Sequence, residues 1–143
     1  MVLRMAILLL VFTQCSSSKS NLVKLSVNDK ASYQIYNPGA GGGQGVNFEI
    51  NLSDSVANLQ PIMLIVNGDT LKNLELLKNQ QTVVASLFYP DPEPTVDNPN
   101  PKPIAKPLIG SAAYQGTLVY KVLEKEYTLE IKDFIEKESP LFP

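Results

Sequence analysis

The sequence predicts an all-β protein, an antiparallel two-sheet sandwich of seven to eight short strands. Three observations lead to this prediction. Short segments alternate between apolar and polar residues, which is the two-residue period of a half-buried strand. Asn67-Gly68 separates two apolar segments, and this dipeptide is a strong hairpin signal because both residues accept positive φ. Turn residues recur at short intervals between the segments, as they do in sandwich domains.

The clearest strand of the first half covers residues 46–52. Its apolar members share one face and are Val46, Phe48, Ile50 and Leu52. Weaker strands are expected at residues 22–27 and 31–36. The glycine-rich segment 39–45 has neither the glycine spacing nor the following helix of a phosphate-binding loop, so we expect a flexible connection there.

The second half is expected to consist of two hairpins with a strand between them. The first hairpin joins strands at 62–66 and 69–77, with a short helix at 71–77 as the alternative for part of the return strand. A turn at Lys78-Asn79 leads to a strand at 81–89. The last hairpin joins residues 116–123 to residues 125–134 around Glu124. Its carboxylates Glu126 and Glu130 are expected on the solvated face.

The stretch Gly116-Thr-Leu-Val-Tyr-Lys-Val122 resembles the penultimate strand of immunoglobulin-like and fibronectin-like domains. Leu118 falls where those families often carry a corner tyrosine, and Tyr120 falls where antibody domains carry a cysteine. The resemblance implies a disulfide-free, immunoglobulin-like sandwich. An open barrel is the main alternative.

The N-terminus has the pattern of an export signal. One positive charge at Arg4 precedes an apolar run at residues 5–12, which is too short to span a bilayer. Phe12-Thr-Gln-Cys15 then leads into a serine-rich tract, and this arrangement resembles the lipobox of bacterial lipoproteins. The resemblance implies cleavage before Cys15 and lipid attachment to it. Because Gln14 stands where that family prefers a small residue, ordinary signal cleavage nearby is the alternative.

These features divide the chain into three parts. They are a lipoprotein signal peptide at 1–14, a lipid-anchored tether at 15–21, and an immunoglobulin-like domain at 22–143. The domain includes a proline-rich loop at residues 90–107. By resemblance, Ser16 after the lipidated cysteine favours the outer membrane, so we expect a protein of the cell envelope.

Composition excludes several kinds of chemistry. The chain has no histidine and one cysteine, which excludes an internal disulfide, a Cys/His zinc site and nucleophilic triads built on imidazole. No basic block is present and the net charge is -2, which argues against a nucleic-acid partner. No cofactor or metal site is predicted, since Asp91, Glu93 and Asp97 do not have the spacing of a calcium loop.

Two groups of residues are candidates for binding a partner. Seven prolines between 90 and 107 favour an extended surface loop, which is either a recognition element, with Pro92 and Pro94 foremost, or a stiff connection between the sheets. The tyrosines near strand ends are either contact residues or packing residues: Tyr33, Tyr36, Tyr89 and Tyr114. We therefore expect a non-catalytic, lipid-anchored envelope module that binds or assembles with another protein. The alternative is a glycan- or peptide-binding accessory lipoprotein.

Overall fold

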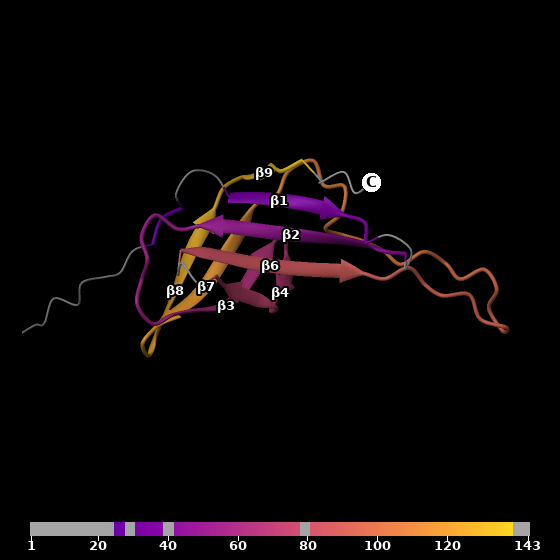
Figure 1. Cartoon of the computed structure of the whole chain (residues 1–143), viewed down its shortest axis with the longest axis horizontal. Coiled ribbons are helices and arrows are strands. Elements are labelled where there is room, and N and C mark those ends of the chain that lie inside the picture. The colour runs from indigo at the N-terminus through magenta and orange to yellow at the C-terminus, as the bar shows by residue number, and fades with distance from the viewer. Residues whose placement is uncertain (1–24, 28–30, 39–41, 78–80, 139–143) are drawn as a thin grey trace, which may run out of the picture.

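The computed structural model of the chain describes residues 25–27, 31–38, 42–77 and 81–138. Within these ranges it contains nine strands in two sheets, and no helix (Figure 1). The strands are β1 (Ala31–Tyr36), β2 (Gln44–Asn51), β3 (Leu59–Val66), β4 (Asp69–Leu71), β5 (Leu74–Leu76), β6 (Thr82–Tyr89), β7 (Gly116–Val122), β8 (Lys125–Ile131) and β9 (Phe134–Glu136). The predicted two-sheet sandwich is confirmed, with nine described strands where seven to eight were expected.

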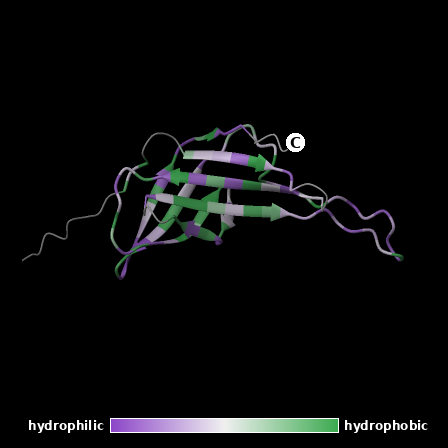
Figure 2. Ribbon diagram, viewed as in Figure 1, coloured by the Kyte–Doolittle hydropathy of each residue, from purple (hydrophilic) through white to green (hydrophobic). Residues whose placement is uncertain are grey.

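The larger sheet has the order β5-β6-β2-β1-β9, and only the β1–β9 pair is parallel. Its central strand β2 has the alternation that the sequence predicts. Val46, Phe48 and Ile50 are fully buried, and the side chains between them point to the outer face. In Figure 2 the same alternation appears as green and purple bands along β2.

The smaller sheet has the order β4-β3-β7-β8, and its strands are joined mainly by tight turns. The β3–β4 turn is the predicted hairpin at Asn67 and Gly68, with φ of 48° and 92°. The β7–β8 turn has two residues, and its first residue, Leu123, takes φ of 56°. Strand β3 contains an irregularity between Pro61 and Met63, as expected where a proline cannot donate to the ladder.

The core between the sheets combines aliphatic residues with a group of aromatic rings. Phe48 of β2 lies 5.5 Å from Tyr114 and 5.2 Å from Phe134, ring centre to ring centre. Tyr33 of β1 lies 4.4 Å from Tyr114. Edge-to-face contacts of this kind add to the burial of each ring. The group therefore links three strands of the larger sheet to the segment that precedes β7 of the smaller sheet.

Three predictions for individual strands were wrong. The expected last strand at 125–134 ends at Ile131, and Phe134 begins β9 in the larger sheet. Residues 69–77 do not form one return strand or a helix: β4 stays in the smaller sheet, and β5 crosses to the larger sheet beside β6. The described part of the expected first strand, Leu25–Val27, makes only an isolated bridge from Val27 to Leu52. The predicted turn at 78–79 and residues 39–41 of the glycine-rich segment lie outside the described residues.

In the described ranges, no helix has the length and apolar character needed to cross a membrane. The signal segment, the tether and Cys15 lie outside those ranges.

Candidate functional site

Residues 90–107 form an arm that projects from one end of the sandwich (Figure 1). The arm connects β6 of the larger sheet to the segment before β7 of the smaller sheet, and it contains no strand. Seven of its positions are prolines, which lack the backbone donor that a ladder needs. The arm therefore both links the sheets and extends beyond them as an outgoing leg and a returning leg.

A short turn closes the tip of the arm. Thr95 and Asn98 exchange two backbone hydrogen bonds of 3.0 and 3.2 Å, and the Asn98 amide also donates to the Thr95 hydroxyl at 3.1 Å. Val96 lies within this turn and is 100% exposed. An apolar side chain held at full exposure by a closed turn is available to another molecule.

The base of the arm is fixed by the carboxylate of Asp91. It accepts a hydrogen bond from the Gly43 amide at 2.7 Å and pairs with the Lys106 ammonium at 3.0 Å. Lys106 also donates to Gln44 at 3.3 Å. The Lys106 hydrogen bond and then the Gly43 amide lower the pKa of Asp91. These contacts join both legs of the arm to the start of β2, so we call Asp91, Lys106 and Gly43 the clasp.

A groove of about 470 Å³ lies between the two legs. Its lining residues are Asp91, Pro92, Pro94, Pro99, Asn100, Pro101 and Pro103. Pro92 and Pro94, the prolines predicted to meet a partner, thus face prolines of the other leg. The lining is largely apolar pyrrolidine rings, with a carboxylate at the base and an amide further out.

Two of the predicted tyrosines hold the foot of the arm. The Tyr114 hydroxyl donates to the carbonyl of Leu108 at 2.6 Å, and the Tyr89 hydroxyl accepts from the Leu108 amide at 3.4 Å. Leu108 is fully buried and Tyr114 is 1% exposed. Burial is the main cause that raises the pKa of Tyr114. Tyr114 therefore packs and anchors, and its ring is not open to a partner.

The other two tyrosines lie on opposite faces of β1. Tyr33 faces the core group, and burial followed by the charge of Glu136 raises its pKa. Tyr36 lies on the outer face over Gly45, where an added Cβ would sit 2.2 Å from the ring. The structure therefore does not bring the four tyrosines together into one platform for a sugar.

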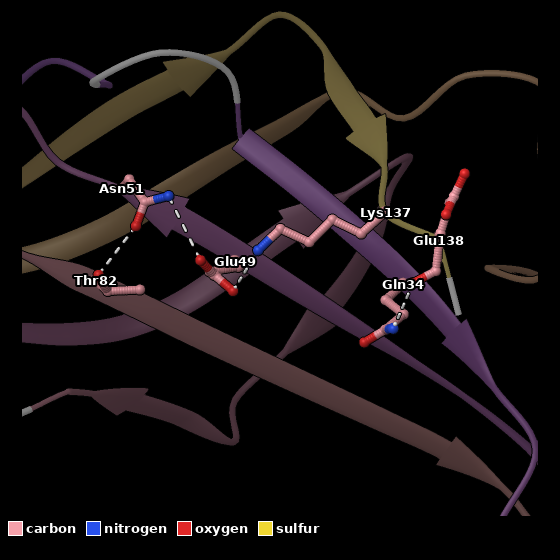
Figure 3. A network of polar contacts seen from close by, with 6 residues as sticks. All are labelled: Gln34, Glu49, Asn51, Thr82, Lys137 and Glu138. Carbon is pink, nitrogen blue, oxygen red and sulfur yellow. Dashed lines mark hydrogen bonds and ion pairs between the residues drawn. The ribbon is translucent and has the colours of Figure 1, made fainter. Parts of the chain in front are cut away.

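The outer face of the larger sheet carries a polar network that we did not predict from the sequence (Figure 3). Lys137, just past β9, pairs with Glu49 at 2.8 Å, and Asn51 donates to Glu49 at 3.5 Å and accepts from Thr82 at 3.0 Å. Nearby, Gln34 donates to the carbonyl of Glu138 at 3.0 Å. The Glu49 carboxylate is thus occupied by an ammonium and an amide.

A small pocket of about 110 Å³ adjoins the network between Glu49 and Ser32. The Ser32 hydroxyl is buried and has no hydrogen-bond partner among the described residues. A space of this size next to an unpaired hydroxyl suits an ordered water.

The alternation along β1 and β2 predicts which side chains share this face, but Lys137 reaches it only through the β1–β9 pairing, which sequence patterns do not reveal.

Within the described ranges, no group of three or more His, Cys, Asp or Glu side chains is placed to hold a metal ion. Comparison of the chain with known protein families, with curated proteins and with solved structures finds no match.

Proposed function

We propose that this protein is a non-catalytic binding or assembly module of the cell envelope, attached to a membrane by lipid on Cys15, which recognises another envelope protein through its proline-rich arm. The observation that carries the proposal is the clasp. Asp91 fixes both legs of the arm to the sandwich while Pro94, Pro99, Pro103 and Val96 beyond it stay exposed. A plain connection between the sheets has no need of an extension held in this way.

The physics of the arm favours recognition of a protein. Proline fixes φ, so an extended proline-rich segment loses little conformational entropy when a partner orders it. Proteins bind such segments in grooves lined by aromatic rings. The clasp adds pre-organisation, because the direction of the arm is set before the partner arrives. Affinity then depends on contacts with the pyrrolidine rings and with Val96 at the tip.

Membrane attachment rests on the sequence of the first fifteen residues. A short apolar run, a lipobox-like Phe12-Cys15 and the only cysteine of the chain at its end support lipidation at Cys15, with the outer membrane as the favoured site. Lipid attachment confines a binding module to one surface and raises its concentration there. Intact mass spectrometry of protein from the source membranes tests this part. A mature chain that begins elsewhere without acyl chains contradicts it.

An immunoglobulin-like topology also belongs to this proposal, and the strand order supports it. Such domains place strands A, B, E and D in one sheet and C, F and G in the other. The observed sheets fit this arrangement if β1, β2, β6 and β5 correspond to strands A, B, E and D. Strands C, F and G then correspond to β3, β7 and β8. Tyr114 lies before the Leu118 position at which those families carry the corner tyrosine, but it makes a comparable bond, from its hydroxyl to the backbone carbonyl of Leu108 upstream of β7.

The proposal is tested by affinity capture from detergent-solubilised envelope with three baits. The first is residues 16–143. The second replaces residues 93–103 by Asn-Gly and keeps Asp91 and Lys106, so that the clasp is retained and only the projecting part is lost. The third carries Thr70→Ala on the exposed edge strand β4 as a control. We expect one envelope protein to bind the first and third baits and not the second. Equal capture by all three, or by none, contradicts recognition through the arm.

A further inference from the structure

Among the described residues, strand β8 forms a long edge of the smaller sheet with no strand paired on its outer side. It pairs with β7 on one side and ends the order β4-β3-β7-β8. The other three edge strands in the described ranges, β4, β5 and β9, have three residues each, whereas β8 has seven. A long edge presents a row of backbone donors and acceptors to which another strand can add. The edge of β8 is therefore the surface of the sandwich best suited to pairing with a strand.

The turn before β8 determines which residues face the open side. Val122 and Lys125 flank a two-residue turn, so they form a hydrogen-bonded pair, and such pairs recur at every second position of the hairpin. The backbone groups that bond to β7 consequently belong to Tyr127, Leu129 and Ile131. The backbone groups of Glu126, Thr128 and Glu130 point outward. In an antiparallel partner strand, only residues of this outward set can stand opposite one another as hydrogen-bonded pairs.

Among the registers with a twofold axis at Thr128, Leu129 or Glu130, in the middle of the strand, charge selects one for pairing with an identical strand. If the twofold axis passes through Thr128, Glu126 of each copy lies opposite Glu130 of the other. If it passes through Glu130, the Glu130 carboxylates of the two copies lie opposite each other. If the axis passes through Leu129, Glu126 of each copy lies opposite Lys132 of the other. Thr128 of each copy then lies opposite Glu130 of the other, and no like charges are opposed. Opposite charges across a strand pair stabilise it and like charges destabilise it.

The same register is favourable on the core side of the strand. There Leu129 meets Leu129 of the second copy and Tyr127 meets Ile131. Tyr127 and Leu129 are only partly buried in one chain, although both pack against the core. Tyr127 also stacks on Tyr120, with ring centres 5.6 Å apart. A second copy therefore covers apolar surface that the edge leaves partly exposed, and this burial adds to the hydrogen bonds.

We propose that two copies of this protein pair through β8, antiparallel and with the twofold axis at Leu129, so that their four-stranded sheets form one continuous sheet. The arm projects from the far end of the sandwich and stays free in such a dimer (Figure 1). Pairing through β8 and recognition through the arm use different surfaces, so either can fail without the other.

Disulfide trapping of the full chain in its membrane tests both the dimer and its register. Leu129→Cys brings two thiols together on the axis, in a non-hydrogen-bonded pair where side chains are closest. Thr128→Cys places the two thiols one step off the axis, each opposite Glu130. With diamide as the oxidant, we expect dimers from Leu129→Cys well above those from the unsubstituted chain, whose lipidated Cys15 has no free thiol. Dimers from Thr128→Cys in preference to Leu129→Cys overturn the register, and background amounts from both overturn the dimer.

A charge exchange provides the second test. Adding Glu126→Lys to the Leu129→Cys chain opposes two lysine pairs and should reduce the trapped dimer about tenfold. Adding Lys132→Glu as well restores opposite charges and should restore the dimer. Failure of the double exchange to do so overturns the proposed pairing. If Leu129→Cys does not fold, sedimentation of the unsubstituted lipoprotein in detergent decides, and a monomer at every concentration overturns the dimer.

Discussion

The hydroxyl of Tyr114 donates a 2.6 Å hydrogen bond to the carbonyl of Leu108, six residues earlier in the chain. Both residues are buried, so this bond closes the corner between the foot of the proline-rich arm and β7 inside the core. A buried carbonyl that lacks a donor is costly, which makes the corner sensitive to loss of one oxygen atom. The returning leg of the arm is thereby tied to the packing of the aromatic rings.

We expect Tyr114→Phe to destabilise the domain by about 1–3 kcal/mol, because the ring remains and the Leu108 carbonyl loses its buried donor. Urea denaturation followed by circular dichroism measures the change. Tyr127→Phe is the matched control, since that tyrosine is only partly buried on β8 and should cost less. Equal stability of the Tyr114→Phe and unsubstituted proteins contradicts the structural role of the corner.

Loss of the clasp should free the arm without unfolding the sandwich. In Asp91→Asn the Gly43 amide keeps an acceptor but the ion pair with Lys106 is lost. ¹⁵N relaxation should then report faster motion for residues 92–105 and unchanged motion for β2 and β6. Asp97→Asn, at the tip of the arm, is the control. An arm that is equally mobile in the unsubstituted and Asp91→Asn proteins shows that the clasp does not order it.

The clasp should also weaken in acid. Because Lys106 and the Gly43 amide lower the pKa of Asp91 in the folded protein, its contribution is present above the unfolded pKa of about 4 and is lost as pH falls through the folded value. The chemical shift of the Gly43 amide, followed by NMR, should titrate with a midpoint below 3.8. A midpoint at or above that value contradicts the ion pair, and Lys106→Gln should raise the midpoint.

Gly45 and Tyr36 should be energetically coupled. In Gly45→Ala the new Cβ would lie 2.2 Å from the Tyr36 ring, so the ring has to move. We expect a cost of about 1–3 kcal/mol, typical of overpacking, and a smaller cost when Tyr36→Ala is already present. Strict additivity in this double-mutant cycle contradicts the contact.

Gly43→Ala should cost more than Gly45→Ala, because its φ is +103° and its Cβ would lie 2.6 Å from the Tyr89 carbonyl oxygen.

Alkaline pH should unfold the domain through its buried tyrosines. Burial is the main cause that raises the pKa of Tyr114 and Tyr120, which are 1% and 2% exposed. A raised folded pKa contributes stability below the unfolded value of about 10 and loses it as pH rises through the folded value. Phenolate absorbance from these two should therefore appear above pH 10 together with loss of circular dichroism. Their ionisation in a protein that stays folded near pH 10 contradicts their burial.

The parts of the fold that follow from local patterns were predictable from the sequence. The alternation around Phe48 gave the buried face of β2, and Asn67-Gly68 gave the first hairpin, because both signals depend only on neighbouring residues. The separation of β4 from β5 was not predictable, since their apolar residues fit one strand equally well and only the pairing with β6 decides between the sheets.

The candidate site was predictable to a similar extent. The density of prolines predicted a surface segment without a ladder, and the structure has one at residues 90–107. The clasp was not predicted, because Asp91 and Gly43 are 48 positions apart and meet only through the β2–β6 pairing. Tyr114 had the same local signal as the half-buried candidates Tyr33, Tyr36 and Tyr89. Only its packing against Phe48 and Leu108 identifies it as a core residue.

Photo-crosslinking in intact cells of the source organism tests the central claim most directly. A benzophenone amino acid replaces Val96, the fully exposed residue at the tip of the arm, or Leu77, a partly exposed apolar residue just past β5. Recognition through the arm predicts one discrete adduct with another envelope protein from position 96 and none of that mass from position 77. The absence of an adduct at position 96, or the same adduct from both positions, contradicts it.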